Sequence, residues 1–227
     1  MLHSRSVPLV QAGVGLLLGV SPLAAQGRII DEGTFIITRA GAPSETESFR
    51  IRVDNGNVIA TGQLNAGTKR VISALTTDSL GTPMDYRVDV RENGASTMSV
   101  SAIGRGGRLT ARSQLPHGNE STREYPVTTG GSVILEEDLI HQTYFALLSK
   151  RGTLQAINLR TSHGNPITLR ALGPEPLTIA GRQVTATHYS MQNGARQREF
   201  WVDSAGRILQ VEIPSIGLKA TRDELPR

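Results

Sequence analysis

Strict alternation of apolar and polar residues is the feature that most constrains the fold of this chain. In residues 48–54, and again in residues 85–91, every second residue is apolar and the residues between are polar or charged. Successive side chains of a β-strand point to opposite faces, so such segments bury one face and expose the other to water. This pattern is typical of antiparallel sheet.

Turn residues separate these segments at short intervals. Asn-Gly occurs at Asn55-Gly56, Asn93-Gly94 and Asn193-Gly194, and both residues tolerate the positive φ that two-residue hairpins require. Turns that contain glycine are also expected at residues 105–108 and 203–206. The predicted hairpins cover residues 47–64, 85–103, 98–115, 183–202 and 197–213. The chain is therefore expected to be mainly β, with about a dozen antiparallel strands forming a curled sheet, a half-open barrel or a sandwich.

One segment departs from this pattern and predicts an amphipathic helix near residues 136–149. Its first residues, Glu136, Glu137 and Asp138, would complement the positive end of a helix dipole, and a basic pair followed by Gly152 would end the helix. One side of the helical wheel collects the residues Leu139, Ile140, Thr143, Tyr144, Leu147 and Leu148. We expect this helix to pack on the concave face of the sheet.

The first 25 residues predict an export signal rather than part of the fold. Arg5 gives a basic start, residues 14–20 are apolar, and the small pair Ala24-Ala25 follows. The apolar stretch is shorter than the roughly 20 residues that a membrane-spanning helix needs, and an uncleaved anchor is the alternative. Cleavage near Ala25 would leave one β-rich domain, residues 26–227, in the periplasm or secreted, with no membrane span.

Composition argues against several classes of site. The chain has no cysteine, which excludes disulfides, thiolate metal sites and a cysteine nucleophile. Lys and Arg outnumber Asp and Glu by 24 to 20, but the arginines are scattered, so no nucleic-acid partner is expected. An outer-membrane barrel would carry aromatic girdles, whereas aromatic residues make up only 4% of this chain.

No catalytic motif stands out in the sequence. The chain lacks a G-x-S-x-G nucleophile turn, a dinucleotide-binding glycine loop and an H-E-x-x-H metal motif. Glu137 and His141 are four residues apart on the expected helix, but a metal site needs at least a third ligand. We therefore predict no catalytic residue, no metal and no cofactor. The alternative is an exported hydrolase with carboxylates from separate strands, because a sheet brings distant acids together.

Five residues are candidates for lining a ligand pocket. Trp201, the one tryptophan of the chain, and Arg207 lie in residues 200–214, the densest apolar segment. The alternative interpretation of this segment is a core hairpin. The other three candidates, on the apolar side of the expected helix, are Tyr144, Leu147 and Leu148.

Three segments carry a family resemblance: REFWVDSAGRILQVEIP at residues 198–214, GLKATRDELP at residues 217–226, and LIHQTY at residues 139–144. Together they resemble exported bacterial β-rich families of unknown function, which carry a signal peptide, a central helix and a closing W-V-D-x-x-G-R hairpin. In outline the chain is also similar to envelope lipoprotein carriers, open β-barrels whose concave sheet wraps helices over an apolar cavity. Those carriers have several helices where this chain predicts one, and neither resemblance implies a catalytic residue.

These observations predict a non-enzymatic envelope protein that binds an apolar or lipid-like ligand, or a partner protein, on the concave face of its sheet. A further alternative is a scaffold that captures another chain by strand addition at an open sheet edge.

Overall fold

The structure is a computed structural model that describes residues 27–40, 42, 44–149, 151–193 and 196–227. The expected export segment and Gly194 of the Asn193-Gly194 turn lie outside these residues. The described residues form fifteen β-strands, one α-helix and three short 3-10 helices. The prediction of a mainly β fold is confirmed, and the structure has more strands than the dozen or so that the alternating pattern predicts.

The first eight strands form an antiparallel meander in which each strand pairs with the next. They are β1 (Arg28–Arg39), β2 (Glu45–Asp54), β3 (Asn57–Ala66), β4 (Lys69–Thr77), β5 (Pro83–Glu92), β6 (Ala95–Arg105), β7 (Arg108–Gln114) and β8 (Glu120–Pro126).

Seven further strands continue the same sheet from its other end. They are β9 (Ser132–Ile134), β10 (Thr153–Asn158), β11 (His163–Ile179), β12 (Arg182–Asn193), β13 (Arg196–Val202), β14 (Ile208–Ile213) and β15 (Leu218–Arg222). Between β9 and β10 lie the 3-10 helix η2 (Ile140–Gln142) and the helix α1 (Thr143–Leu148), and the other 3-10 helices are η1 (Pro116–Gly118) and η3 (Pro214–Ile216).

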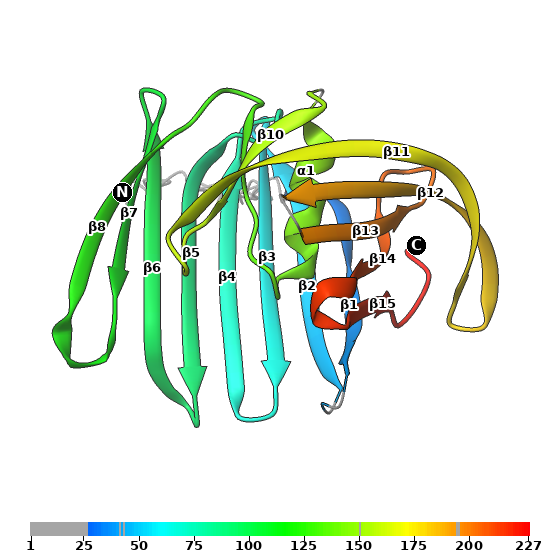
Figure 1. Ribbon diagram of the computed structural model, residues 1–227, viewed down its shortest axis with the longest axis horizontal. Coiled ribbons are helices and arrows are strands. Elements are labelled where there is room, and N and C mark those ends of the chain that lie inside the picture. The colour runs from blue at the N-terminus through cyan, green and yellow to red at the C-terminus, as the bar shows by residue number, and fades with distance from the viewer. Residues whose placement is uncertain (1–26, 41, 43, 150, 194–195) are drawn as a thin grey trace, which may run out of the picture.

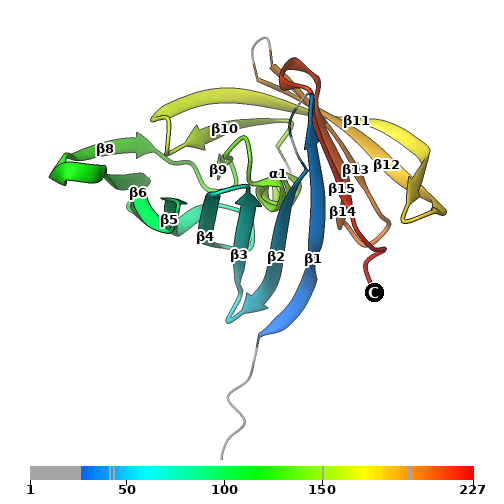
Figure 2. The same ribbon diagram turned by 90° about the horizontal axis from the view of Figure 1, so that it is seen from below.

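All fifteen strands belong to one unclosed sheet in the order β8-β7-β6-β5-β4-β3-β2-β1-β15-β14-β13-β12-β11-β10-β9. Among the described strands, only the β9–β10 pair is parallel. The first and last strands, β1 and β15, pair in the middle of the order, with Phe35 opposite Arg222. The sheet curls so that β10 and β11 arch over α1 while β2–β4 lie on its other side (Figures 1 and 2). The predicted curled sheet with a helix on its concave face is confirmed.

The observed strands follow the alternation of the sequence. In β2, Phe49 and Ile51 are buried whereas Ser48 and Arg50 are exposed. The turns also agree, because Asn55 and its following glycine both have positive φ, at 49° and 79°. Such a turn matches the right-handed twist of the strands that it joins.

The core has two parts that lie on opposite faces of the sheet. The main cluster fills the concave face and includes Phe145 of α1 together with inward residues of both halves of the chain. A smaller cluster of Ile179, Ala186, Trp201 and Leu209 lies on the other face of β11–β14. Within the described residues, no helix is long and apolar enough to cross a membrane.

The helix is shorter than the predicted span of 136–149, and its predicted acidic start is wrong. Helical structure begins at Ile140 in η2 and continues as α1 only to Leu148. Glu136 and Asp138 precede it and form ion pairs with Arg160 instead. A distant cation therefore holds these acids more strongly than a helix dipole would.

Candidate functional site

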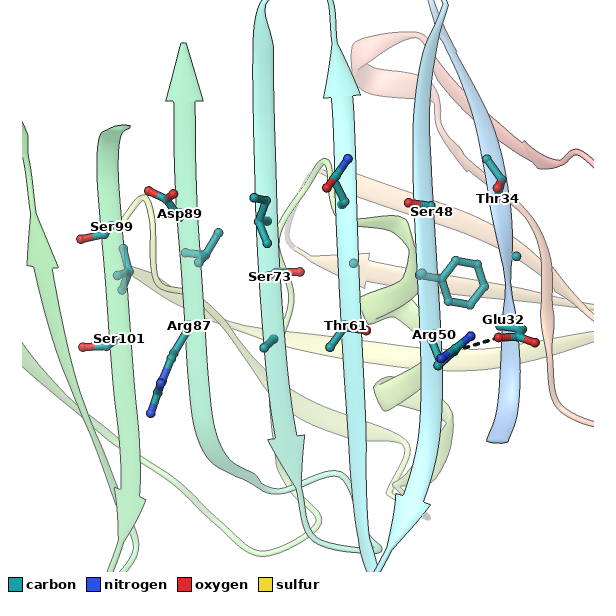
Figure 3. A pocket seen from close by; sticks show the side chains of 18 residues that line it. Glu32, Thr34, Ser48, Arg50, Thr61, Ser73, Arg87, Asp89, Ser99 and Ser101 are labelled. Carbon is teal, nitrogen blue, oxygen red and sulfur yellow. Dashed lines mark hydrogen bonds and ion pairs between the residues drawn. The ribbon is translucent and has the colours of Figure 1, made fainter. Parts of the chain in front are cut away.

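A shallow groove of about 910 Å³ crosses the outer face of β1–β6, on the side of the sheet opposite α1 (Figure 3). Each strand contributes small or polar side chains, and the register places them in rows. One row is Glu32, Arg50, Thr61, Ala74, Arg87 and Ser101, and the next is Thr34, Ser48, Gln63, Ile72, Asp89 and Ser99. We call this surface the outer groove.

Charges along the outer groove are balanced locally. Arg50 Nε lies 2.8 Å from Glu32 Oε2, as Figure 3 shows, and Arg87 Nε lies 3.5 Å from Asp85 Oδ1. Asp89 pairs with the Arg91 guanidinium, which helps to lower the pKa of Asp89 after the larger effect of a hydrogen bond from Ser96. Exposed pairs of this kind contribute about 0–1 kcal/mol each. The outer groove therefore carries no focused charge.

Two glycines in the floor of the outer groove leave room for buried side chains beneath it. A Cβ on Gly62 would overlap the imidazole of His141, and a Cβ on Gly33 would overlap the guanidinium of Arg222. His141 is fully buried, pairs through Nδ1 with the buried Glu47, and stacks on Phe49 at a ring distance of 6.0 Å.

Replacing Gly62 with alanine is expected to destabilise the fold by about 1–3 kcal/mol, because the added methyl group overpacks against His141. Urea denaturation would measure this loss. Thr61→Ala, on the opposite face of the same strand, is the control and should change stability by less than about 0.5 kcal/mol. In a His141→Ala background the Gly62→Ala cost should largely disappear; an unchanged cost there would show that the two side chains do not compete for this space.

Two carboxylates converge on one guanidinium at the segment that leads into η2. Arg160 Nε donates to Glu136 Oε2 at 3.0 Å, and the terminal nitrogens of Arg160 pair with Asp138. Lys69 Nζ lies 3.2 Å from Asp138 Oδ2. Burial raises the pKa of Glu136 against the opposing effect of Arg160. Burial also disfavours the ionised form of Asp138, but Arg160 and Lys69 outweigh it and lower the pKa of this carboxyl.

Hydrolase sites often contain two carboxyl groups whose environments give them different pKa values. The Glu136–Asp138 cluster is therefore the candidate site for the hydrolase alternative. Glu136 is fully buried, however, and its oxygens are occupied: Oε1 accepts from the hydroxyl of Tyr86 at 3.4 Å and from the N–H of Leu159 at 3.2 Å, and Oε2 accepts from Arg160. A catalytic acid needs an oxygen within reach of a substrate. The cluster is better explained as an ion-pair network that fixes residues 136–138.

A separate pocket of about 560 Å³ opens on the inner face of β10–β13, beside the segment that leads into η2. Aliphatic side chains form one part of its lining: Leu135, Ala156, Ile167, Met191 and Ile213. Polar side chains form the other: Glu137, Asn158, Thr161, His163, Asn165, Asn193, Arg196, Gln197 and Arg198. We call this site the inner pocket.

Arg198 connects the inner pocket to the helical segment. Its Nη1 donates to Thr143 Oγ1 at 2.8 Å, and its Nη2 donates to the carbonyl oxygens of Glu136 and Glu137 at 3.2 and 3.3 Å. At the rim, Arg196 and Glu137 form an ion pair. Contacts between β13 and the segment that leads into α1 therefore hold Arg196, Arg198 and Glu137 in place.

The three helix residues predicted to line a ligand site lie together, but in the main core. Tyr144, Leu147 and Leu148 pack against this cluster and line neither the outer groove nor the inner pocket. The interior that they were expected to line is filled at this level by their own side chains and by Phe145.

The other two predicted site residues lie elsewhere. Trp201 belongs to the smaller cluster on the outer face, stacks on His188 at 4.4 Å, and donates from Nε1 to Glu175 at 3.0 Å. Arg207 pairs with Asp203 across its own turn at 2.8 Å. The structure thus does not bring the five predicted residues into one site.

Sequence reasoning missed the inner pocket because its lining comes from several strands and a loop. One signal was available. Arg198, Phe200 and Val202 have the same parity in β13, so Arg198 shares the buried face of two core residues. A charged residue at an inward position of an alternating strand needs a partner or a function.

Among the described residues, no group of three or more histidine, aspartate or glutamate side chains is arranged to hold a metal ion. The fold and the two surfaces thus define an open, curled β-sheet protein with a groove on one face and a partly aliphatic pocket on the other.

Comparison with known proteins agrees with this class. Residues 117–221 match the family described as Domain of unknown function (DUF6134). A solved structure, described as a beta-barrel-like protein of Domain of Unknown Function DUF1849 from Brucella abortus, superposes with a TM-score of 0.56 at 8% identity, covering 86% of this chain and 96% of that chain. A comparison with curated proteins gives no match.

The expected resemblance to β-rich proteins of unknown function is confirmed at this level. The structural similarity shows the fold alone. All residues that line the inner pocket fall within the segment that matches the family, whereas those of the outer groove precede it.

Proposed function

We propose that this chain is an exported, non-enzymatic binding protein of the cell envelope that holds a single-chain amphiphile in the inner pocket. The observation that carries the proposal is a pocket on the concave side of the sheet whose lining combines buried aliphatic side chains with polar ones. Export is proposed from the pattern of residues 1–25.

The dimensions and lining of the inner pocket support a small-molecule site. Such sites are usually a few hundred Å³ in volume, with apolar walls and a small number of polar groups that orient the ligand. Ala156, Ile167 and Met191 lie on adjacent strands and are all buried. An aliphatic chain would cover these residues, while its head group would contact polar side chains of the pocket lining. The outer groove is shallower and more open to solvent than the inner pocket, so it would bury less of an alkyl chain.

The proposal is tested by measuring the binding of dodecanoate to the purified protein by calorimetry. Saturable binding with one site per chain is expected, and no binding of any dodecyl compound would contradict the proposal. Asn165→Trp places a large side chain at the exposed rim of the pocket and should weaken binding about tenfold or more, a loss of about 1.4 kcal/mol.

Thr168→Trp is the matched control for this experiment. Thr168 is also exposed on β11, does not line the inner pocket, and should leave dodecanoate binding unchanged. Equal weakening by both tryptophan variants would place the binding site elsewhere.

N-terminal sequencing of the envelope-purified protein tests the proposed export, with a mature start near Ala25 as the expected result.

A further inference from the structure

The inner pocket contains a buried cation, Arg198, that forms no direct ion pair within the described residues. Arg198 is only 7% exposed. Its three hydrogen bonds within the described structure go to one hydroxyl and two carbonyl oxygens, all of them neutral. A guanidinium has five N–H donors and a full positive charge, so neutral acceptors compensate only part of the cost of burying it.

Other arginines that are largely buried are arranged differently. Arg222 pairs with Asp31, and Arg160 pairs with both Glu136 and Asp138. For Arg198, no carboxylate of the described residues lies within ion-pair distance. The difference matters because a buried charge is normally retained only with a counter-charge.

Among the charged residues that line the inner pocket, Arg198 is the one without a direct ion-pair partner in the described structure. Arg196 and Glu137 at the rim pair with each other and cancel. Burial lowers the pKa of Arg198 to about 10, and the distant carboxylates of Glu47 and Asp138 oppose this shift only in part. An anion at the pocket wall would reverse the effect of burial.

We infer that Arg198 is the head-group anchor of the inner pocket, and that the ligand is a single-chain amphiphile with a carboxylate head. This inference rests on the proposed function and names its ligand class. The aliphatic side chains of the lining contact the chain, and Arg198 donates a charge-assisted hydrogen bond to the carboxylate. A neutral chain of the same length gains only the first interaction.

A ligand series separates the inference from the proposed function. The native protein should bind dodecanoate about tenfold to a hundredfold more tightly than dodecanol, as a hydrogen bond to a charged group implies. Dodecylammonium should bind more weakly than dodecanol, and dodecyl phosphate shows whether the site accepts a phosphate head group as well. If dodecanol binds as tightly as dodecanoate, the inference is overturned while the proposed function stands.

Arg198→Gln should remove the preference for dodecanoate over dodecanol. Arg170→Gln is the matched control, because Arg170 is exposed on β11 and does not line the inner pocket, so the preference should persist there. Loss of the preference in both variants, or in neither, would contradict the assignment to Arg198.

Arg198 also stabilises the segment that leads into α1 through its hydrogen bonds, so its replacement could disturb the fold. A second variant therefore keeps Arg198 and changes a residue next to it. Met191 lies directly opposite Arg198 in the β12–β13 register and lines the inner pocket, so Met191→Glu would supply an internal carboxylate. We expect Met191→Glu to be more stable than Met191→Gln in urea and to lose the preference for dodecanoate. A glutamate variant that is less stable than the glutamine variant would show that Arg198 does not lack an anion.

Discussion

Replacing Arg160 with methionine is expected to lower the free energy of unfolding by about 3–5 kcal/mol at neutral pH, because removing one member of a buried ion-pair network leaves uncompensated charge. Glu136 has a fully buried side chain, and the Asp138 side chain is 13% exposed. Without Arg160 both carboxylates would remain in a poorly solvated site, with only Lys69 near Asp138. Urea denaturation at pH 7 measures the loss.

The pH dependence of this variant provides a second measurement. Without Arg160, burial would raise the pKa of both carboxyls in the folded state above their unfolded values. Stability would then be greatest below the unfolded values and would fall as pH rises through the folded values. The deficit should therefore shrink as the solution is acidified towards the ordinary carboxyl range. In the native protein the pKa of Asp138 is lowered, so the ionised side chain stabilises the fold at neutral pH. This contribution to stability is lost in acid, when Asp138 becomes protonated.

Arg87→Met is the control for the Arg160 variant. The Arg87 side chain is 75% exposed and pairs with Asp85 on the outer face. Its loss should change stability by less than about 1 kcal/mol, with little dependence on pH. A deficit for Arg160→Met that is as small as this, or that grows on acidification, would show that the carboxylates do not depend on Arg160.

Truncating Phe145 to alanine should cost about 3–5 kcal/mol, as the loss of a large buried aromatic side chain normally does. Phe145 is fully buried and meets Tyr144 edge-on at 5.8 Å. Because α1 lies inside the curl of the sheet, a cavity at this position has sheet on more than one side and is poorly able to collapse. Thermal and urea denaturation would both report the loss.

Two further truncations calibrate the Phe145 result. Leu147 is only partly buried, so Leu147→Ala should cost less. Ile103 is 50% exposed on the outer face, and Ile103→Ala should change stability by less than about 0.5 kcal/mol. If Phe145→Ala costs no more than Leu147→Ala, the helix is not enclosed as the structure indicates.

Local features of the fold were predictable from sequence because their causes are local. Positive φ at Asn93-Gly94 and at Gly106-Gly107 follows from the residues in each turn, and both hairpins form as predicted. The turn at Ala180-Gly181 was missed, because alanine rarely adopts the φ of 47° that it has there. Strand faces were equally predictable, since a period of two needs no knowledge of the partner strand.

Features set by distant residues could not be read in the same way. The acids at 136–138 looked like the start of a helix because Arg160, which holds two of them, is 22 or more residues away. The expected helix placed His141 one turn from Glu137, but the His141 side chain is buried against Glu47, 94 residues away. The helical wheel was also misleading, because a helix enclosed by a sheet is buried on several sides and Phe145 lies off the predicted stripe.

The pairing of β1 with β15 has a consequence for how this sheet is assembled. Arg222 reaches the carbonyl of Glu32 across 190 residues of chain, whereas every other pair of neighbouring strands is consecutive in sequence. A circular permutant that joined β15 to β1 through a linker and opened the chain between β8 and β9 would make all fifteen strands pair with their sequence neighbours. In such a chain every strand would pair with its sequence neighbour, the longest connection being the helical segment between β9 and β10, so the chain should reach the same sheet faster.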